Sequence, residues 1–245
     1  MTVSKGYWAK YLELLGSINQ SARTQFLNYF VSVDYQSPAG RQAVIDFAFA
    51  LVTKYGEASA EAACQLYDAI AEATGVSVPP AVPAATATIG ETAKAINGTI
   101  AASTNADYIS GTVERLVKQA SADTIYQNAI RDGAECAWIP NGDTCAFCIM
   151  LASNGWMMAS KKTLKGNHAS HVHSNCDCNF AVRFASDTKY DGYDPSIYLD
   201  RYDSAEGDTW HDKLNSMRRE QYQLNGDEIR KQKRIAYAVR NQNKV

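Results

Sequence analysis

The sequence predicts an α+β fold that is predominantly helical, with a helical N-terminal layer and a small β-sheet in the C-terminal half. Apolar residues recur at helical spacing through most of residues 5–132, which predicts amphipathic helices. Short segments rich in strand-forming residues follow Ala134 and predict the sheet. Five of the six cysteines lie between Cys136 and Cys178, and this clustering indicates a metal site in the second half.

Residues 1–75 are expected to form an N-terminal helical region. One apolar stripe predicts a helix over about residues 5–32; it consists of Trp8, Leu12, Leu15, Ala22, Phe26 and Phe30. Ser37 and Pro38 provide an N-cap and a first-turn proline for a second helix, which we expect to be interrupted near Gly56. A third apolar run ends at Gly75, a residue type favoured just after a helix. It contains Cys64, which we interpret as a small buried hydrophobe without a role.

Residues 76–90 are expected to form a linker that is rich in Pro and Ala. Three of the six prolines and no charged residue occur in residues 76–88, so a helix is blocked and an extended connection is favoured. Residues 91–185 follow as a central region. Its first part predicts helices on both sides of a loop at residues 103–105, with a last short helix before Asp132 and Gly133.

The strand signals begin at Ala134. The stretch AECAWIP predicts one strand, Asn141-Gly142 predicts a turn, and NFAVRF alternates Phe180 and Val182 with smaller or charged residues. Residues 186–245 are expected to form an acidic aromatic arm, with a short helix after Asp194-Pro195, and a basic helical tail. The tail, residues 212–245, has a local net charge of +5 and an apolar face formed by Ile229, Ala236 and Val239.

Overall charge and hydropathy exclude several function classes. The 24 Lys+Arg and 26 Asp+Glu give a net charge of −2, so the whole chain has no electrostatic attraction to nucleic acid or an anionic membrane. Neither a signal-peptide pattern nor an apolar run of 18 residues is present, so we expect a soluble protein made in a reducing cytoplasm, with no membrane partner.

The most specific motif is a cluster of metal-ligand residues. Cys145-x2-Cys148 has the spacing at which a tight turn directs two thiolates at one ion, and His173-x2-Cys176 repeats it. These four residues predict one structural Zn²⁺ per chain, and Cys178 is the main rival for either position of the second pair. His171 and His168 are further candidates. Reduced cysteines dispersed in a core, or two disulfides, are the alternatives.

The cluster does not predict catalysis. His168 and His171 lack the adjacent glutamate of a His-Glu-x-x-His protease, and no histidine has the His-x-Glu pattern of a zinc deaminase. Phosphate-binding glycine loops and the Gly-x-Ser-x-Gly motif are also missing from the sequence. We therefore predict that the protein is not an enzyme and has no small-molecule substrate.

Several stretches resemble the Mu F-like phage head-morphogenesis, or minor capsid, proteins, in the branch found in phages of Gram-positive bacteria. The similar stretches lie between about residues 105 and 240 and include AWIPNGDTCAFCIMLASNGW, HVHSNCDC and YDGYDPSIYLDRY. The family motif of Cys-x-x-Cys followed by His-x-x-Cys-x-Cys falls on Cys145, Cys148, His173, Cys176 and Cys178. The chain departs from the family at Ile139, where many relatives are basic, and at Ser174, where proline is common.

This resemblance implies an internal virion component that acts at the portal during procapsid assembly, with roles extending to DNA ejection. The implied partners are the portal protein and a scaffold or major capsid protein, and the implied location is the capsid interior after assembly in the host cytoplasm. One alternative is a phage-carried zinc-dependent nuclease or toxin effector that uses His168, His171 and His173. Another is a DNA-binding zinc module, although we expect any DNA contact to be weak.

Overall fold

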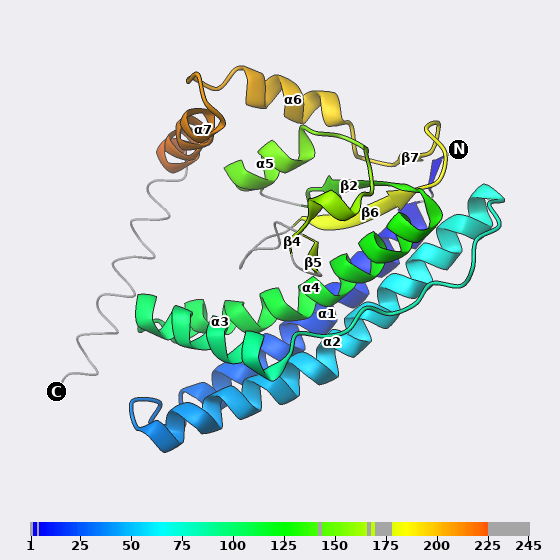
Figure 1. The fold of residues 1–245 in the computed structure, drawn as a ribbon. Coiled ribbons are helices and arrows are strands. Elements are labelled where there is room, and N and C mark those ends of the chain that lie inside the picture. Colours follow the sequence, from blue (N-terminus) through cyan, green and yellow to red (C-terminus); the bar gives the residue numbers. More distant parts are fainter. Residues whose placement is uncertain (1, 4, 142–143, 166–167, 170–177, 225–245) are drawn as a thin grey trace. The chain divides into compact units, whose positions relative to one another are not determined.

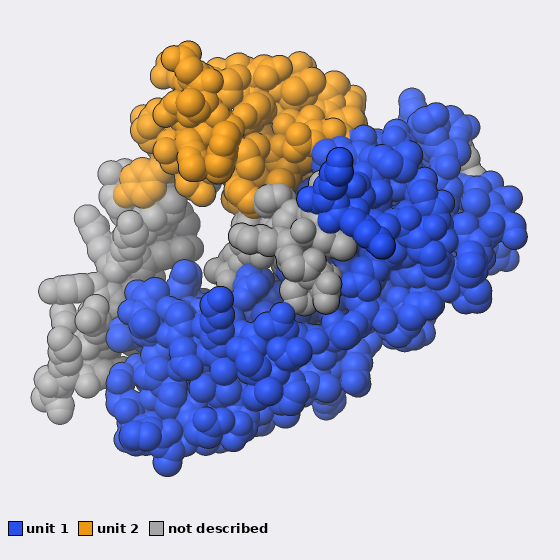
Figure 2. Space-filling view, viewed as in Figure 1, with its two compact units in different colours: residues 1–139, 156–193 blue, residues 140–155, 194–245 orange. Residues whose placement is uncertain are grey.

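The computed structural model describes residues 2–3, 5–141, 144–165, 168–169 and 178–224 (Figure 1). Within these residues the chain forms seven α-helices and a three-stranded antiparallel sheet in its C-terminal half, so the predicted helix-rich architecture is confirmed. The chain divides into two compact units (Figure 2). Unit 1 comprises Met1–Ile139 and Trp156–Tyr193, and unit 2 comprises Pro140–Gly155 and Asp194–Val245.

The helical layer of unit 1 contains four helices: α1 (Lys5–Phe30), α2 (Pro38–Thr74), α3 (Ile89–Ala102) and α4 (Ala106–Asp132). Each helix contributes apolar side chains to one core, for example Phe26, Val44, Ile96 and Val113. The predicted stripe of α1 is buried apart from the half-buried Leu12. Burial of this shared apolar surface is the main force that holds the four helices together.

The ends of α2 lie where local sequence signals place them. The Ser37 hydroxyl accepts a hydrogen bond from the Gly40 amide at 3.1 Å, Pro38 is the first helical residue, and Gly75 ends the helix at φ +67°. The predicted break near Gly56 is wrong, because α2 runs unbroken through this glycine. A Cβ at Gly56 would lie 2.7 Å from Thr86 Cγ2, so the glycine makes room for the segment that crosses the helix.

A second correction concerns the residues before Gly133. We expected a separate short helix there, but α4 continues without interruption from Ala106 to Asp132 and ends at Gly133, which has φ +67°. Polar residues in the second half of α4 obscure its apolar periodicity, and several of them are buried, among them Ser121, Asp123, Thr124 and Asn128. Thr124 and Asn128 form hydrogen bonds with residues 76–88, so tertiary contacts explain why these polar side chains are buried.

Residues 76–88, here called the connector, join α2 to α3 in extended conformation. Side chains of α2 and α4 bind its backbone. Thr124 Oγ1 accepts a hydrogen bond from the Ala84 amide at 3.0 Å, and Asp68 Oδ1 accepts one from the Ala81 amide at 2.8 Å. Side chains therefore satisfy several backbone polar groups of the connector in place of a strand partner.

The sheet of unit 1 has the strand order β3 (Met157–Met158), β2 (Glu135–Ile139) and β6 (Asn179–Arg183). Strands β2 and β6 pair antiparallel over five residue pairs, and Arg183 Nε lies 2.7 Å from the Glu135 carboxylate. Both predicted strands are confirmed. Phe180, Ala181 and Val182 are all buried, so β6 is covered on both faces and its burial does not alternate.

Short strand pairs and one 3-10 turn complete unit 1. Strand β1 (Thr2–Val3) pairs in parallel with β7 (Lys189–Tyr190), and β4 (Leu164–Lys165) pairs with β5 (His168–Ala169). The 3-10 turn η1 spans Lys161–Thr163.

Unit 2 contains α5 (Ala146–Ala152), α6 (Pro195–Asp203) and α7 (Trp210–Leu224). Its core is small and consists of Ala146, Ile149, Leu214 and Met217, with partly buried tyrosines of α6 packed against it. As predicted, α6 begins after Asp194, whose carboxylate accepts a hydrogen bond from the Ser196 amide, and has proline in its first turn. Among the described residues of the whole chain, no helix is long and apolar enough to cross a membrane.

Candidate functional site

The candidate metal site includes two cysteines at the start of α5, Cys145 and Cys148. Cys145 has extended backbone angles, φ −66° and ψ 156°, and is the N-cap residue of the helix, while Cys148 lies in its first turn. Residues three apart at a helix start project to the same side, so the Cys-x-x-Cys spacing brings the two thiols together. The Sγ atoms of Cys145 and Cys148 are 3.4 Å apart.

This distance distinguishes between two kinds of sulfur pair. Sulfur atoms in a disulfide are separated by about 2.05 Å. Two thiolates on one tetrahedral zinc, each with a Zn–S bond of about 2.3 Å, are separated by about 3.8 Å. The observed 3.4 Å is much closer to the second value. The pair therefore fits one half of a tetrahedral zinc site and is not a disulfide.

The two thiols differ in their exposure. Cys148 is buried, at 1% exposure, beside the core residue Ile149, whereas Cys145 is half-buried. An ion held by this pair would thus have one ligand fixed by core packing and another at the rim of the unit. The Cys145 side chain makes no capping hydrogen bond to the amides of α5.

A residue of α7 holds the peptide groups on both sides of Cys145. The Gln221 side chain donates from Nε2 to the Thr144 carbonyl at 2.7 Å and accepts at Oε1 from the Ala146 amide at 2.9 Å. Our sequence reasoning missed Gln221. Its spacing from Leu214 and Met217, seven and four residues, places it on the buried face of the helix, and this polar residue on an apolar face is the signal that could have found it.

Cys136 and Cys178, which belong to the cysteine cluster of the sequence, lie in unit 1. Cys178, a predicted ligand, is buried and directly precedes β6. Cys136 lies in β2 with its partners Met157 and Val182, and burial raises the pKa of its thiol well above the ordinary value.

The remaining predicted ligands, His173 and Cys176, lie outside the described residues, as does the alternative His171. For His168 the structure gives only the backbone, in β5. In the part of the chain that the structure describes, no group of three or more His, Cys, Asp or Glu side chains is placed to hold a metal. The described part of the predicted centre is therefore the Cys145–Cys148 pair.

Predictions from the sequence also concern Cys64, the basic tail and a turn at Asn141-Gly142. Cys64 is buried in α2, as predicted, and burial raises its pKa to about 11. The apolar residues predicted for the tail, Ile229, Ala236 and Val239, lie outside the described residues, as does Gly142 of the predicted turn.

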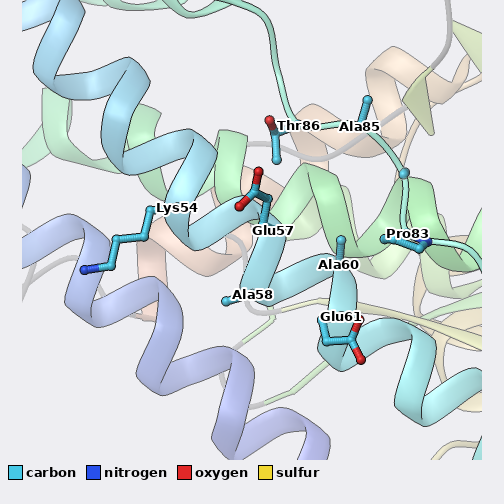
Figure 3. A pocket seen from close by; sticks show the side chains of 9 residues that line it. Lys54, Glu57, Ala58, Ala60, Glu61, Pro83, Ala85 and Thr86 are labelled. Carbon is cyan, nitrogen blue, oxygen red and sulfur yellow. The ribbon is translucent and has the colours of Figure 1, made fainter.

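A cavity of about 770 Å³ lies between α2 and the connector (Figure 3). Its lining is mostly alanine and proline, with Lys54, Glu57 and Glu61 as the charged side chains. None of the predicted ligand residues is among the residues that line it.

The chain was compared with protein-family models, curated proteins and solved structures. A model of the VG15 protein family matches residues 2–205, a range that includes all five candidate ligands and ends before α7. The comparisons with curated proteins and with solved structures gave no match. Because the match spans most of the sequence, the chain belongs to the VG15 protein family.

Proposed function

We propose that this chain is a phage minor capsid protein, an internal virion component that acts at the portal during procapsid assembly and is stabilised by one structural zinc ion. The observation that carries the proposal is the Cys145–Cys148 pair, with its Sγ atoms 3.4 Å apart at the start of α5. This pair opens the motif through which the sequence resembles the Mu F-like head-morphogenesis proteins.

The zinc ligands in this proposal are Cys145 and Cys148 together with two of His173, Cys176 and Cys178. Four thiolate or imidazole ligands close the coordination sphere, which is typical of a structural site and leaves no open position for a substrate. Such an ion stabilises folding, since apparent zinc-binding free energies in small sites are about 10–16 kcal/mol. Among the described residues of unit 2, the cluster that joins α5 to α7 contains four buried apolar residues, so a metal would add substantially to its stability.

Metal analysis tests the zinc site directly. The full chain, purified under reducing conditions without added zinc, should contain close to one zinc ion per chain. Replacement of the zinc by Co²⁺ should produce the absorption of thiolate-to-cobalt charge transfer, which reports that cysteine sulfur is bound. Protein without metal that also fails to take up Co²⁺ would overturn the proposed site.

Absence of catalysis separates this proposal from the nuclease or toxin alternative. The full chain incubated with DNA, RNA or casein, in the presence of zinc, magnesium or manganese, should show no turnover. Metal-dependent cleavage that disappears in His171→Ala would favour the effector instead, because that activity needs a histidine ligand at an exchangeable metal.

Partner binding is tested in particles. The protein should be found inside purified virions at the portal vertex, and deletion of residues 226–245 should reduce its incorporation into procapsids. We expect weak binding to duplex DNA at physiological salt with or without these residues. If the deletion leaves incorporation intact and removes a strongly salt-dependent affinity for DNA, the tail contacts nucleic acid and not the portal.

A further inference from the structure

We propose that Gln221 is a positioning residue for the Cys145–Cys148 pair, so that metal binding by the thiols and docking of α7 stabilise each other. This inference rests on the proposed zinc site and assigns a role to a helix that lies beyond the region matched by the family. Its basis is a set of contacts within unit 2 alone.

Gln221 forms two hydrogen bonds with the backbone around Cys145. Gln221 Nε2 donates to the Thr144 carbonyl at 2.7 Å, and Gln221 Oε1 accepts from the Ala146 amide at 2.9 Å. One planar side-chain amide thus binds the peptide groups that precede and follow the cysteine. The direction of the Cys145 Cα–Cβ bond depends on these two peptide planes, so Gln221 restricts where the thiol can point.

The side-chain carboxamide of Gln221 matches the two groups that it binds. The site needs one donor and one acceptor about as far apart as the nitrogen and oxygen of a single carboxamide. Glutamate would keep the acceptor for the Ala146 amide but present a second acceptor to the Thr144 carbonyl. The Ala146 amide is one of the donors at the start of α5 that have no acceptor within the helix, and Gln221 of α7 provides its acceptor.

Packing of α7 against α5 holds Gln221 in place. Leu214 and Met217 are buried against Ala146 and Ile149, and these contacts fix α7 on α5. Gln221 lies one turn after Met217 on the same face of α7. The glutamine is therefore held by a packed helix, and any ordering of the Cys145 turn by a metal must in return favour the docked position of α7.

Supporting residues around metal ligands typically change metal affinity 10- to 100-fold when they are replaced. We expect Gln221→Ala to weaken Co²⁺ and Zn²⁺ binding by the full chain about 10-fold, measured by competition with a chromogenic chelator. Gln221→Glu should lie between this variant and the wild type. Gln223→Ala is the matched control, because Gln223 is exposed on the same helix and should leave the affinity unchanged.

A second control separates positioning from general stability. Met217→Ala removes buried apolar contacts of α7 but leaves the amide of Gln221 in place. At temperatures well below unfolding it should lower metal affinity less than Gln221→Ala does, and only Gln221→Ala should alter the thiolate-to-cobalt absorption per bound ion. In the wild type, adding Zn²⁺ should slow hydrogen exchange in α7, and this effect should shrink in Gln221→Ala.

These outcomes distinguish the two proposals. A wild-type chain that binds neither Zn²⁺ nor Co²⁺ overturns the zinc site. A wild-type chain that binds both, with unchanged affinity and spectrum in Gln221→Ala, leaves the zinc site standing and overturns the role of Gln221. An equal loss of affinity in Met217→Ala and Gln221→Ala, with the same cobalt spectrum, also overturns specific positioning.

Discussion

Asn128 forms with Val82 both hydrogen bonds that a neighbouring strand residue would form. Its Oδ1 accepts from the Val82 amide at 3.0 Å, and its Nδ2 donates to the Val82 carbonyl at 2.9 Å. Asn128 is buried in α4, whereas Val82 lies in the connector. One side chain of a helix thereby replaces a strand partner, and the connector is fixed on the helical layer without a sheet.

We predict that Asn128→Ala destabilises the protein by about 2–3 kcal/mol, since it removes two hydrogen bonds and leaves backbone groups of Val82 unpaired. The measurement is the free energy of unfolding in urea. Asp68→Ala removes one exposed bond to the Ala81 amide and should cost less than about 1 kcal/mol. If both variants lost the same free energy of unfolding, the two hydrogen bonds between Asn128 and Val82 would contribute no more stability than the single bond of Asp68.

Gly56 provides a test of close packing between α2 and the connector. Alanine normally stabilises a helix by about 1 kcal/mol over glycine. At this position a Cβ would lie 2.7 Å from Thr86 Cγ2, so we predict that Gly56→Ala is destabilising. In a Thr86→Ala background the obstructing methyl is gone, and the same change should become stabilising. Urea unfolding of the four proteins in this double-mutant cycle gives the coupling directly.

Asp132 should make stability depend on acid pH. Hydrogen bonds from Arg131 and then from the buried Tyr67 lower the pKa of this carboxyl below 3.8. Because the pKa is lower in the folded state, the carboxylate adds stability above about pH 4, and this stability is lost as the pH falls through the folded pKa. Asp132→Asn should therefore cost about 1 kcal/mol at pH 7 and progressively less below pH 4.

Tyr67→Phe is the control for this pH dependence. It removes one donor to Asp132 but keeps the carboxylate and the Arg131 bonds, so most of the acid-dependent loss of stability should remain. If Asp132→Asn changed the unfolding free energy by the same amount at pH 3 and pH 7, the charge of Asp132 would have no part in the effect.

Features that depend on adjacent residues were predictable from the sequence. Ser37 with Pro38 and Asp194 with Pro195 each begin a helix, and Gly75 ends one, because the capping chemistry is contained in a few consecutive residues. The Cys145-x2-Cys148 spacing likewise predicts neighbouring thiols, since three residues at a helix start determine the geometry.

Features that depend on distant partners were not predictable. The sequence alone predicts a helix break at Gly56, because it does not show that Thr86, thirty positions later, packs closely against this glycine. Gln221 is visible in the sequence only as a polar residue on the apolar face of α7, and the groups it binds lie 75 and 77 positions earlier in the chain, so its role could not be assigned. At Gly56 a tertiary contact overrides the low helix propensity of glycine, and at Gln221 a tertiary contact gives an ordinary helix residue its partners.

The final prediction concerns the zinc-dependent part of the stability. An ion that binds only the folded chain adds about 4 kcal/mol when its free concentration is 1,000 times the dissociation constant. Zinc should thus raise the melting temperature of the full chain, and a chelator should abolish the increase. Cys145→Ser and Cys148→Ser should each lose most of this increase, whereas Cys64→Ser, which changes a buried cysteine of α2, should keep it. Because each variant is compared with and without zinc, any packing defect from the substitution cancels. A full zinc-dependent increase in both Cys145→Ser and Cys148→Ser would exclude this thiol pair as ligands.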